Sequence, residues 1–94
     1  MYLVHEENHD CLCVAHTVGS GLMWLIMNKW LDGNTIGILE NDEEILMKDL
    51  VENSDTNPFL IFNYCVELQY KNGIESVMEF LEIFGIYFNE IEVA

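Results

Sequence analysis

The sequence predicts an α+β fold in which a small antiparallel sheet, made by an N-terminal hairpin and a C-terminal strand, packs against three or four helices. Two β-prone runs open the chain, apolar helical segments fill its middle, and an alternating run closes it. Strands at the two ends of a helical centre are typical of α+β proteins. Because 94 residues accommodate one hydrophobic core, we expect residues 1–94 to form a single domain.

The chain is expected to begin with a hairpin and a helix. Residues 2–6 (YLVHE) and 11–16 (CLCVAH) are β-prone runs joined by a short polar stretch. A glycine-containing break follows, in which Ser20 is a suitable N-cap for an apolar helix over residues 22–31. Residues 35–39 (TIGIL) fit either an extended connector or an edge strand.

Three further helices and a strand are predicted after this connector. Asn41-Asp42-Glu43-Glu44 has the form of an N-cap with acids in the first turn, which predicts a short helix ending near Glu52. Asn57-Pro58 predicts the start of a third helix, Phe59 to Lys71. A fourth helix follows from apolar residues repeating at i, i+3, i+4 and i+7, and a strand from the alternation in residues 87–93. The repeating apolar residues are Ile74, Val77, Met78 and Leu81.

Residues 5–16 (HEENHDCLCVAH) hold all three histidines and two of the three cysteines, which raises the question of a metal site. Zinc requires four such ligands in a tetrahedron. On an extended strand, however, Cys11 and Cys13 point to one face and His16 to the other. We therefore expect Cys11, Cys13 and Ala15 to form an inner face under the first helix, His5 and His16 to be cross-strand neighbours, and no metal or cofactor to bind.

Charge sets this sequence apart. It has 17 acidic residues against three lysines and no arginine, for a formal net charge of −14. Such a surface repels nucleic acid and anionic membranes and attracts basic surfaces. No Gly-rich phosphate loop is present, no arginine is available to clamp a substrate, and no basic residue near Cys11 or Cys13 would lower the pKa of a thiol nucleophile. We expect neither an enzyme nor a direct binder of nucleic acid or membrane.

The acids occur in patches, which we predict to bind a basic partner. A small domain stays soluble with a net charge of magnitude roughly 2 to 8, so the excess repulsion here calls for another explanation. Carboxylates at helical or alternate-strand spacing approximate the phosphate spacing of nucleic acid. The predicted partner-binding residues are Glu6, Glu7, Asp10, Glu40, Asp42, Glu43, Glu44, Glu75, Glu79, Glu82, Glu90 and Glu92.

Apolar side chains exceed what a small core needs. Trp24, Met27 and Trp30 lie on the first predicted helix, and more aromatic residues lie on the third. A central buried helix explains them, and so does an exposed patch used for a homodimer or for anchoring on a partner.

Parts of the chain resemble small acidic proteins carried by phages and mobile elements of Gram-positive bacteria. The resemblance rests on the hairpin residues EENH and VAH, the segment GLMWLIMNKWL and the closing IYFNEIEV. Many small acidic proteins of that origin inhibit host defence, including anti-CRISPR and anti-restriction proteins, and several mimic DNA. The resemblance implies an inhibitor without naming its target.

Charge and resemblance together predict an anti-CRISPR type inhibitor that acts as a nucleic-acid mimic in the cytoplasm of a bacterial host. Its expected partner is a basic nucleic-acid-binding host protein, such as a Cas9-like effector or nuclease. Two alternatives remain open: an immunity protein that neutralises a basic toxin or nuclease, and a homo-oligomeric accessory protein without catalysis. The longest apolar run, Leu22 to Met27, is far shorter than the roughly 20 residues a membrane span needs.

Overall fold

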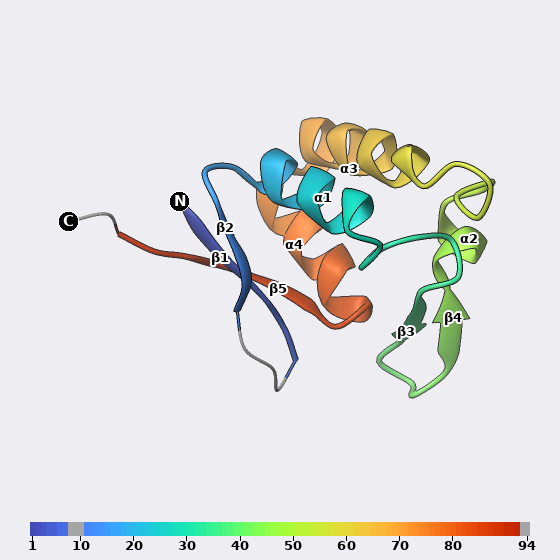
Figure 1. The fold of residues 1–94 in the computed structure, drawn as a ribbon. Helices are drawn as coiled ribbons and strands as arrows, with labels where there is room; N and C mark the ends of the chain where they lie inside the picture. Colours follow the sequence, from blue (N-terminus) through green and yellow to red (C-terminus); the bar gives the residue numbers. More distant parts are fainter. Residues whose placement is uncertain (8–10, 93–94) are drawn as a thin grey trace.

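The computed structural model describes residues 1–7 and 11–92, and it confirms the α+β fold (Figure 1). Five strands and four helices are formed by these residues. In chain order they are β1 (Tyr2–Glu6), β2 (Cys11–Ala15), α1 (Val18–Met27), β3 (Ile36–Ile38), β4 (Glu44–Leu46), α2 (Met47–Leu50), α3 (Phe59–Asn72), α4 (Ile74–Ile83) and β5 (Ile86–Glu90). None of the helices in the described ranges has the length and apolar character that crossing a membrane requires.

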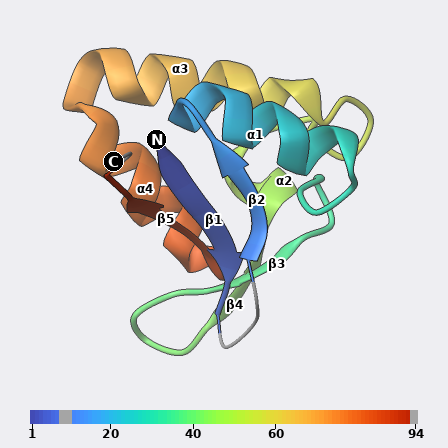
Figure 2. The ribbon, with the colours of Figure 1, turned by 60° about the vertical axis from the view of Figure 1, so that its left-hand side comes forward.

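The main sheet has three antiparallel strands in the order β2-β1-β5, so the N-terminal hairpin and the C-terminal strand share it as predicted. Helix α1 contacts β1 and β2, and α4 contacts β5. Helix α3 packs on α1 and α4, farther from the sheet, as Figures 1 and 2 show. The main sheet is therefore covered on one face by α1 and α4, with α3 beyond them, and β3 and β4 form a separate two-stranded sheet.

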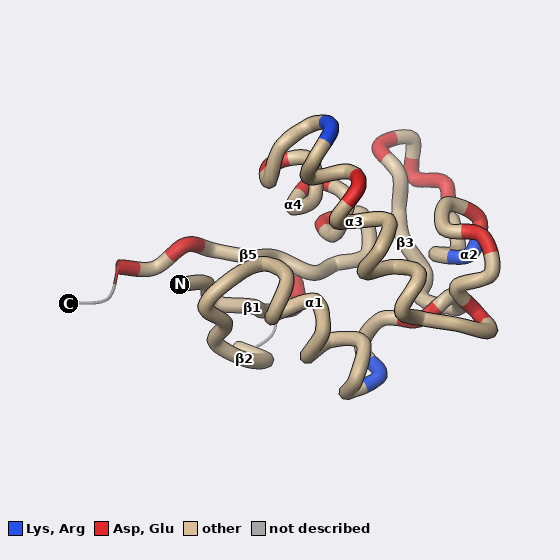
Figure 3. The backbone as a smooth tube through the Cα atoms, turned by 90° about the horizontal axis from the view of Figure 1, so that it is seen from above, with Lys and Arg blue, Asp and Glu red and all other residues tan. Residues whose placement is uncertain are grey.

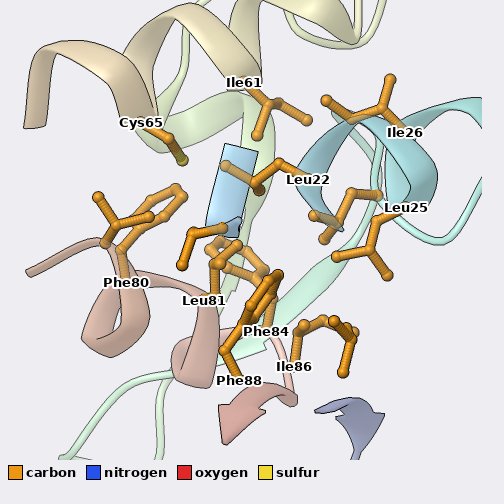
Figure 4. Close-up of a cluster of buried hydrophobic side chains, with 14 of the residues drawn as sticks. Leu22, Leu25, Ile26, Ile61, Cys65, Phe80, Leu81, Phe84, Ile86 and Phe88 are labelled. Atoms are coloured by element: carbon orange, nitrogen blue, oxygen red, sulfur yellow. The ribbon is translucent and has the colours of Figure 1, made fainter. Parts of the chain in front are cut away.

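The hydrophobic core lies between this sheet and the helices. Val4 of β1 is buried in one cluster with Phe88, Leu25 and Leu81. Figure 4 shows Phe88 of β5, Leu25 of α1 and Leu81 of α4 in this cluster. Ile61 of α3 closes the core from above. Burying each large apolar side chain contributes about 1.5–3 kcal/mol, which is why alternating strand residues and one face of each helix point here.

The first helix begins and ends earlier than predicted. Thr17, not Ser20, is the N-cap: its Oγ1 accepts a hydrogen bond from the Ser20 N–H at 3.0 Å, and Ser20 Oγ accepts one from the Thr17 N–H at 3.2 Å. The prediction placed the cap at the wrong member of this capping box. The helix ends at Met27, because Lys29 adopts a positive φ of 63° and turns the chain, which leaves Trp30 outside the helix.

The predicted second helix is wrong over its first half. Glu44–Leu46 is strand β4, paired with β3, and only α2 is helical. Asn41 and Asp42 form a turn: Asn41 Oδ1 accepts from the Glu43 N–H, and Asp42 has a positive φ of 65°. The same residue types that cap helices also make turns, and here the pairing with Ile36–Ile38 decides between them. Of the two interpretations of residues 35–39, the edge strand is the one the structure has.

The last three elements match their predictions closely. Asn57 Oδ1 accepts a hydrogen bond from the Phe59 N–H at 3.2 Å at the start of α3. Helix α4 follows directly after Gly73, which has a positive φ of 90°. Strand β5 begins one residue earlier than predicted and ends at Glu90, with Ile86 and Phe88 buried.

Candidate functional site

Acidic residues are unevenly distributed over the fold. No Asp or Glu occurs from residue 11 to residue 31, the stretch that forms β2 and α1, and its one charged residue is Lys29. In Figure 3 the tube of α1 carries no red, while red segments lie on α4, around α2, near β3 and at the end of β5. The molecule thus has an acid-free side and an acidic side.

A groove of about 810 Å³ lies on the acidic side, between α3, α4 and the segment that follows β3. Glu79 and Glu82 of α4 line it, and so does Glu40 from the segment after β3. All three are exposed. The structure therefore brings together acids that are far apart in the chain and that the sequence predicted only as separate patches.

Close approach of β3 to α4 shapes this groove. A Cβ added to Gly37 would lie 2.8 Å from Ile83 Cγ2 and 2.9 Å from the Phe84 ring, so only glycine fits between strand and helix. Ile36 and Ile38 flank Gly37, with 57% and 51% of their surfaces exposed. Of these two, Ile38 lines the groove.

The end of the N-terminal hairpin extends the acidic side. Burial raises the pKa of Tyr87 above its usual range, and the nearby carboxylates of Glu7 and Glu82 raise it further. Glu7 is anchored at this position, because its backbone N–H donates to the Gly85 carbonyl at 3.0 Å. Tyr87 thus links the hairpin end to α4. We call the four exposed acids of this region the acidic band: Glu7, Glu40, Glu79 and Glu82.

The remaining predicted acids lie around the band or away from it. Asp42 and Glu43 lie in the turn after β3, and Glu44 lines a separate cavity of about 180 Å³ beside α2. Glu90 lines a cavity of about 460 Å³ with Met1 and Gln69, at the other end of β5. Glu6 borders a cavity of about 270 Å³ with Glu7. Glu75 lies in the first turn of α4, and Glu92 follows β5. Asp10 is outside the described residues.

The predicted arrangement of histidines and cysteines is wrong in part. A register shift between Val4 and His5 places His5 opposite Cys11, so His16, which follows β2 and is exposed, is not its cross-strand neighbour. His5 instead stacks on Tyr87 with ring centroids 5.4 Å apart, and its Nε2 lies 2.7 Å from Asn89 Nδ2. Among residues 1–7 and 11–92, no three His, Cys, Asp or Glu side chains are placed to hold a metal ion.

The inner face predicted for β2 is only partly formed. Ala15 is buried, Cys13 is half-buried and Cys11 is exposed, because the register shift turns the end of the strand outward. Burial, followed by the neighbouring Cys11, raises the pKa of Cys13. Burial raises the pKa of Cys65 to about 12. A thiolate nucleophile is thus disfavoured at both buried positions.

The predicted apolar interface is divided by the structure. Trp24 packs against the core, whereas 68% of Met27 and 41% of Trp30 are exposed. Trp30 borders the cavity beside Glu6 and Glu7, next to the acidic band.

Sequence reasoning did not find the apolar floor of the groove, although its signal is present. Tyr64 and Leu68 lie one helical turn apart on α3, and Phe80 and Ile83 lie three apart on α4. This spacing identifies each face as apolar, but no single-helix pattern indicates that the two faces meet beside β3.

The fold and the groove define a small α+β protein with an acidic groove that has an apolar floor. Comparison with protein-family models, with curated proteins and with solved structures finds no match to this chain. Its function is therefore inferred from the groove and the charge distribution.

Proposed function

We propose that the protein is a phage or mobile-element inhibitor of the anti-CRISPR type. In the cytoplasm of a bacterial host, it occupies the basic groove of a nucleic-acid-binding defence protein, such as a Cas9-like effector or nuclease, and acts without catalysis or cofactor. The observation that carries this proposal is the acidic band, in which exposed acids from β1's end, α4 and the β3–β4 connection lie on one side of the molecule.

The spacing of the acids along α4 supports nucleic-acid mimicry. Residues three or four apart on a helix have Cβ atoms about 5–6 Å apart, and Glu75, Glu79 and Glu82 follow this spacing along α4. Neighbouring phosphates of a nucleic-acid strand are separated by a comparable distance. Lysines and arginines that bind phosphates would therefore find carboxylates within reach.

The net charge supports fast, salt-sensitive association. Opposite potentials on two proteins accelerate their encounter, and the effect falls steeply as ionic strength rises. Because the net charge is −14 and the chain has only three lysines and no arginine, few cations on this chain compete with a basic partner. Lys71 pairs with Glu67, which is outside the band, at 3.7 Å.

A second candidate is an immunity protein that covers the basic active site of a toxin nuclease. The apolar floor of the groove favours it. A toxin that docked there could bury apolar side chains on this floor, whereas phosphate mimicry alone requires only the carboxylates. A toxin gene beside the coding sequence would distinguish this candidate from an anti-defence protein.

Affinity capture from host lysate at low and high salt tests the proposal. We expect basic nucleic-acid-binding proteins to be retained at low salt, and to be displaced by added DNA or RNA and by high salt. The Glu79→Lys/Glu82→Lys variant should lose them, whereas the Glu90→Lys/Glu92→Lys variant, which changes the net charge by the same amount away from the groove, should retain them. If no basic partner is captured at low salt, or if both variants behave alike, the proposal fails.

A further inference from the structure

The floor of the acidic groove is apolar. Tyr64 and Leu68 of α3, Phe80 and Ile83 of α4, and Leu50 of α2 line it. Phe80 is buried, but 37% of Leu50 and 51% of Ile38 at the edge of the groove remain exposed. An acidic surface that served only as a phosphate mimic would gain nothing from exposed apolar side chains beside its carboxylates.

Acids from two elements line the groove together with this floor. Glu79 and Glu82 come from α4, and Glu40 comes from the segment that follows β3. A ligand lying in the groove would therefore place its apolar surface on the floor and its flanking side chains against carboxylates. Lysine and arginine are the side chains that pair with carboxylates, and arginine binds them bidentately.

We propose that the groove binds an amphipathic helix of the partner protein, whose apolar stripe is flanked on both sides by lysine or arginine. The inference rests on the proposed function, because it specifies which part of a basic partner reaches the acidic side. Helices bind apolar grooves through residues at i, i+3, i+4 and i+7, the spacing that also brings their charged residues to the two margins of the stripe. The volume of about 810 Å³ is enough to receive several large side chains.

Charge selects this occupant over the alternatives. Nucleic acid and an anionic membrane surface would bring further negative charge to Glu40, Glu79 and Glu82. A second copy of this chain would bring a net charge of −14 to the same acids. Only a cationic ligand with apolar side chains can pair with the carboxylates of the groove and also bury its apolar floor.

Binding of a synthetic peptide by the full chain tests the inference. The probe is a leucine–lysine helix with one apolar stripe, and the control is a scrambled peptide of the same composition without a stripe. Because the stripe adds apolar burial to an equal charge attraction, we expect the amphipathic peptide to bind about tenfold more tightly. Fluorescence anisotropy gives the affinities, and NMR shift changes should centre on the groove.

Two isoleucines of β3 provide a matched pair of variants. Ile38→Ser removes an exposed apolar side chain that lines the groove, and Ile36→Ser removes its neighbour that does not. We expect Ile38→Ser to weaken the amphipathic peptide about tenfold and Ile36→Ser to change its affinity less than about twofold. Leu50→Ser provides a second groove variant, and circular dichroism checks that each variant remains folded.

Each outcome decides the inference separately from the proposed function. Equal binding of the two peptides, or equal effects of the two isoleucine variants, would overturn the amphipathic-helix occupant even if basic partners are still captured through the acids. Peptide-free dimers with shift changes in the groove would assign it to a second copy. Stripe-dependent peptide binding combined with no capture of a basic nucleic-acid-binding protein would keep the helix groove and reject the nucleic-acid mimic.

Discussion

Gly33 lies where the loop after α1 contacts the loop before α3. A Cβ at this position would lie 2.1 Å from the backbone nitrogen of Asp55. The Gly33 N–H donates to the Ser54 carbonyl at 3.1 Å, and its own carbonyl accepts from the Lys48 N–H at 2.9 Å. Among the described glycines, Gly33 has the closest contact with backbone atoms of another segment.

We predict that Gly33→Ala destabilises the protein by about 3 kcal/mol, because the methyl group must displace backbone and not a flexible side chain. Gly19→Ala is the matched control: its Cβ would meet Phe62 and Thr17 at ordinary distances of 3.8 and 3.9 Å, in a helix. It should stabilise by about 0.5–1 kcal/mol. Urea unfolding measures both, and similar effects of the two substitutions would contradict the close contact between Gly33 and Asp55.

At the scale of elements, local sequence patterns predicted the helices and strands whose pattern lies within one segment. They missed the features that depend on pairing between two strands. The apolar repeat of α4 and the alternation of β5 each identified their element directly. Glu44–Leu46 was mistaken for a helix start, because its strand exists only through hydrogen bonding to β3. The register shift opposite His5 is likewise a property of two strands, so the face of Cys11 was misassigned.

The candidate site was likewise predictable only in part from the sequence. Individual acids such as Glu79 and Glu82 could be named from helical spacing, since both belong to one helix. Their approach to Glu40 depends on β3 packing against the end of α4, where Gly37 admits the Ile83 and Phe84 side chains. No pattern within either segment contains that contact.

The pKa of Tyr87 depends on whether Glu7, at the end of β1, and Glu82, on α4, both lie near its ring. Its pKa is raised first by burial and then by Glu7 and Glu82, so the neutral phenol is favoured in the folded state. Stability from this group is fully present below the unfolded pKa of about 10 and is lost as the pH rises from there through the raised folded value.

We predict that Glu7→Gln and Glu82→Gln each lower the pKa of Tyr87 towards its usual value, while burial keeps it raised in part. NMR titration of the Tyr87 ring measures the change, and Glu90→Gln, at the far end of β5, serves as the control. Unchanged Tyr87 titration in both band variants would mean that the two elements do not share one electrostatic site.

At the scale of the whole molecule, the acidic side is a source of instability that binding would relieve. Like charges at i and i+4, such as Glu75 and Glu79, each cost a few tenths of a kcal/mol. Self-repulsion from a net charge of −14 adds to this cost, whereas the acid-free side formed by β2 and α1 contributes apolar packing without repulsion. The free protein is thus expected to trade stability for attraction to a cationic partner.

We therefore predict that sodium chloride stabilises the free protein. Raising the ionic strength from about 0.01 M to about 0.15 M shortens the Debye length from about 30 Å to about 8 Å, which screens repulsion between acids. The free energy of unfolding should rise by about 1 kcal/mol, the sum of several like-charge pairs. Urea unfolding at the two salt concentrations measures the change.

The Glu79→Gln/Glu82→Gln variant connects this stability to binding. It removes two charges from the acidic band, so at low salt it should be more stable than the natural protein and should gain less from added salt. The same variant should bind basic partners more weakly, because it has lost the carboxylates that the proposal assigns to them. A variant that gains stability but keeps its affinity would show that these two acids burden the fold without serving the partner, and would move the interface away from α4.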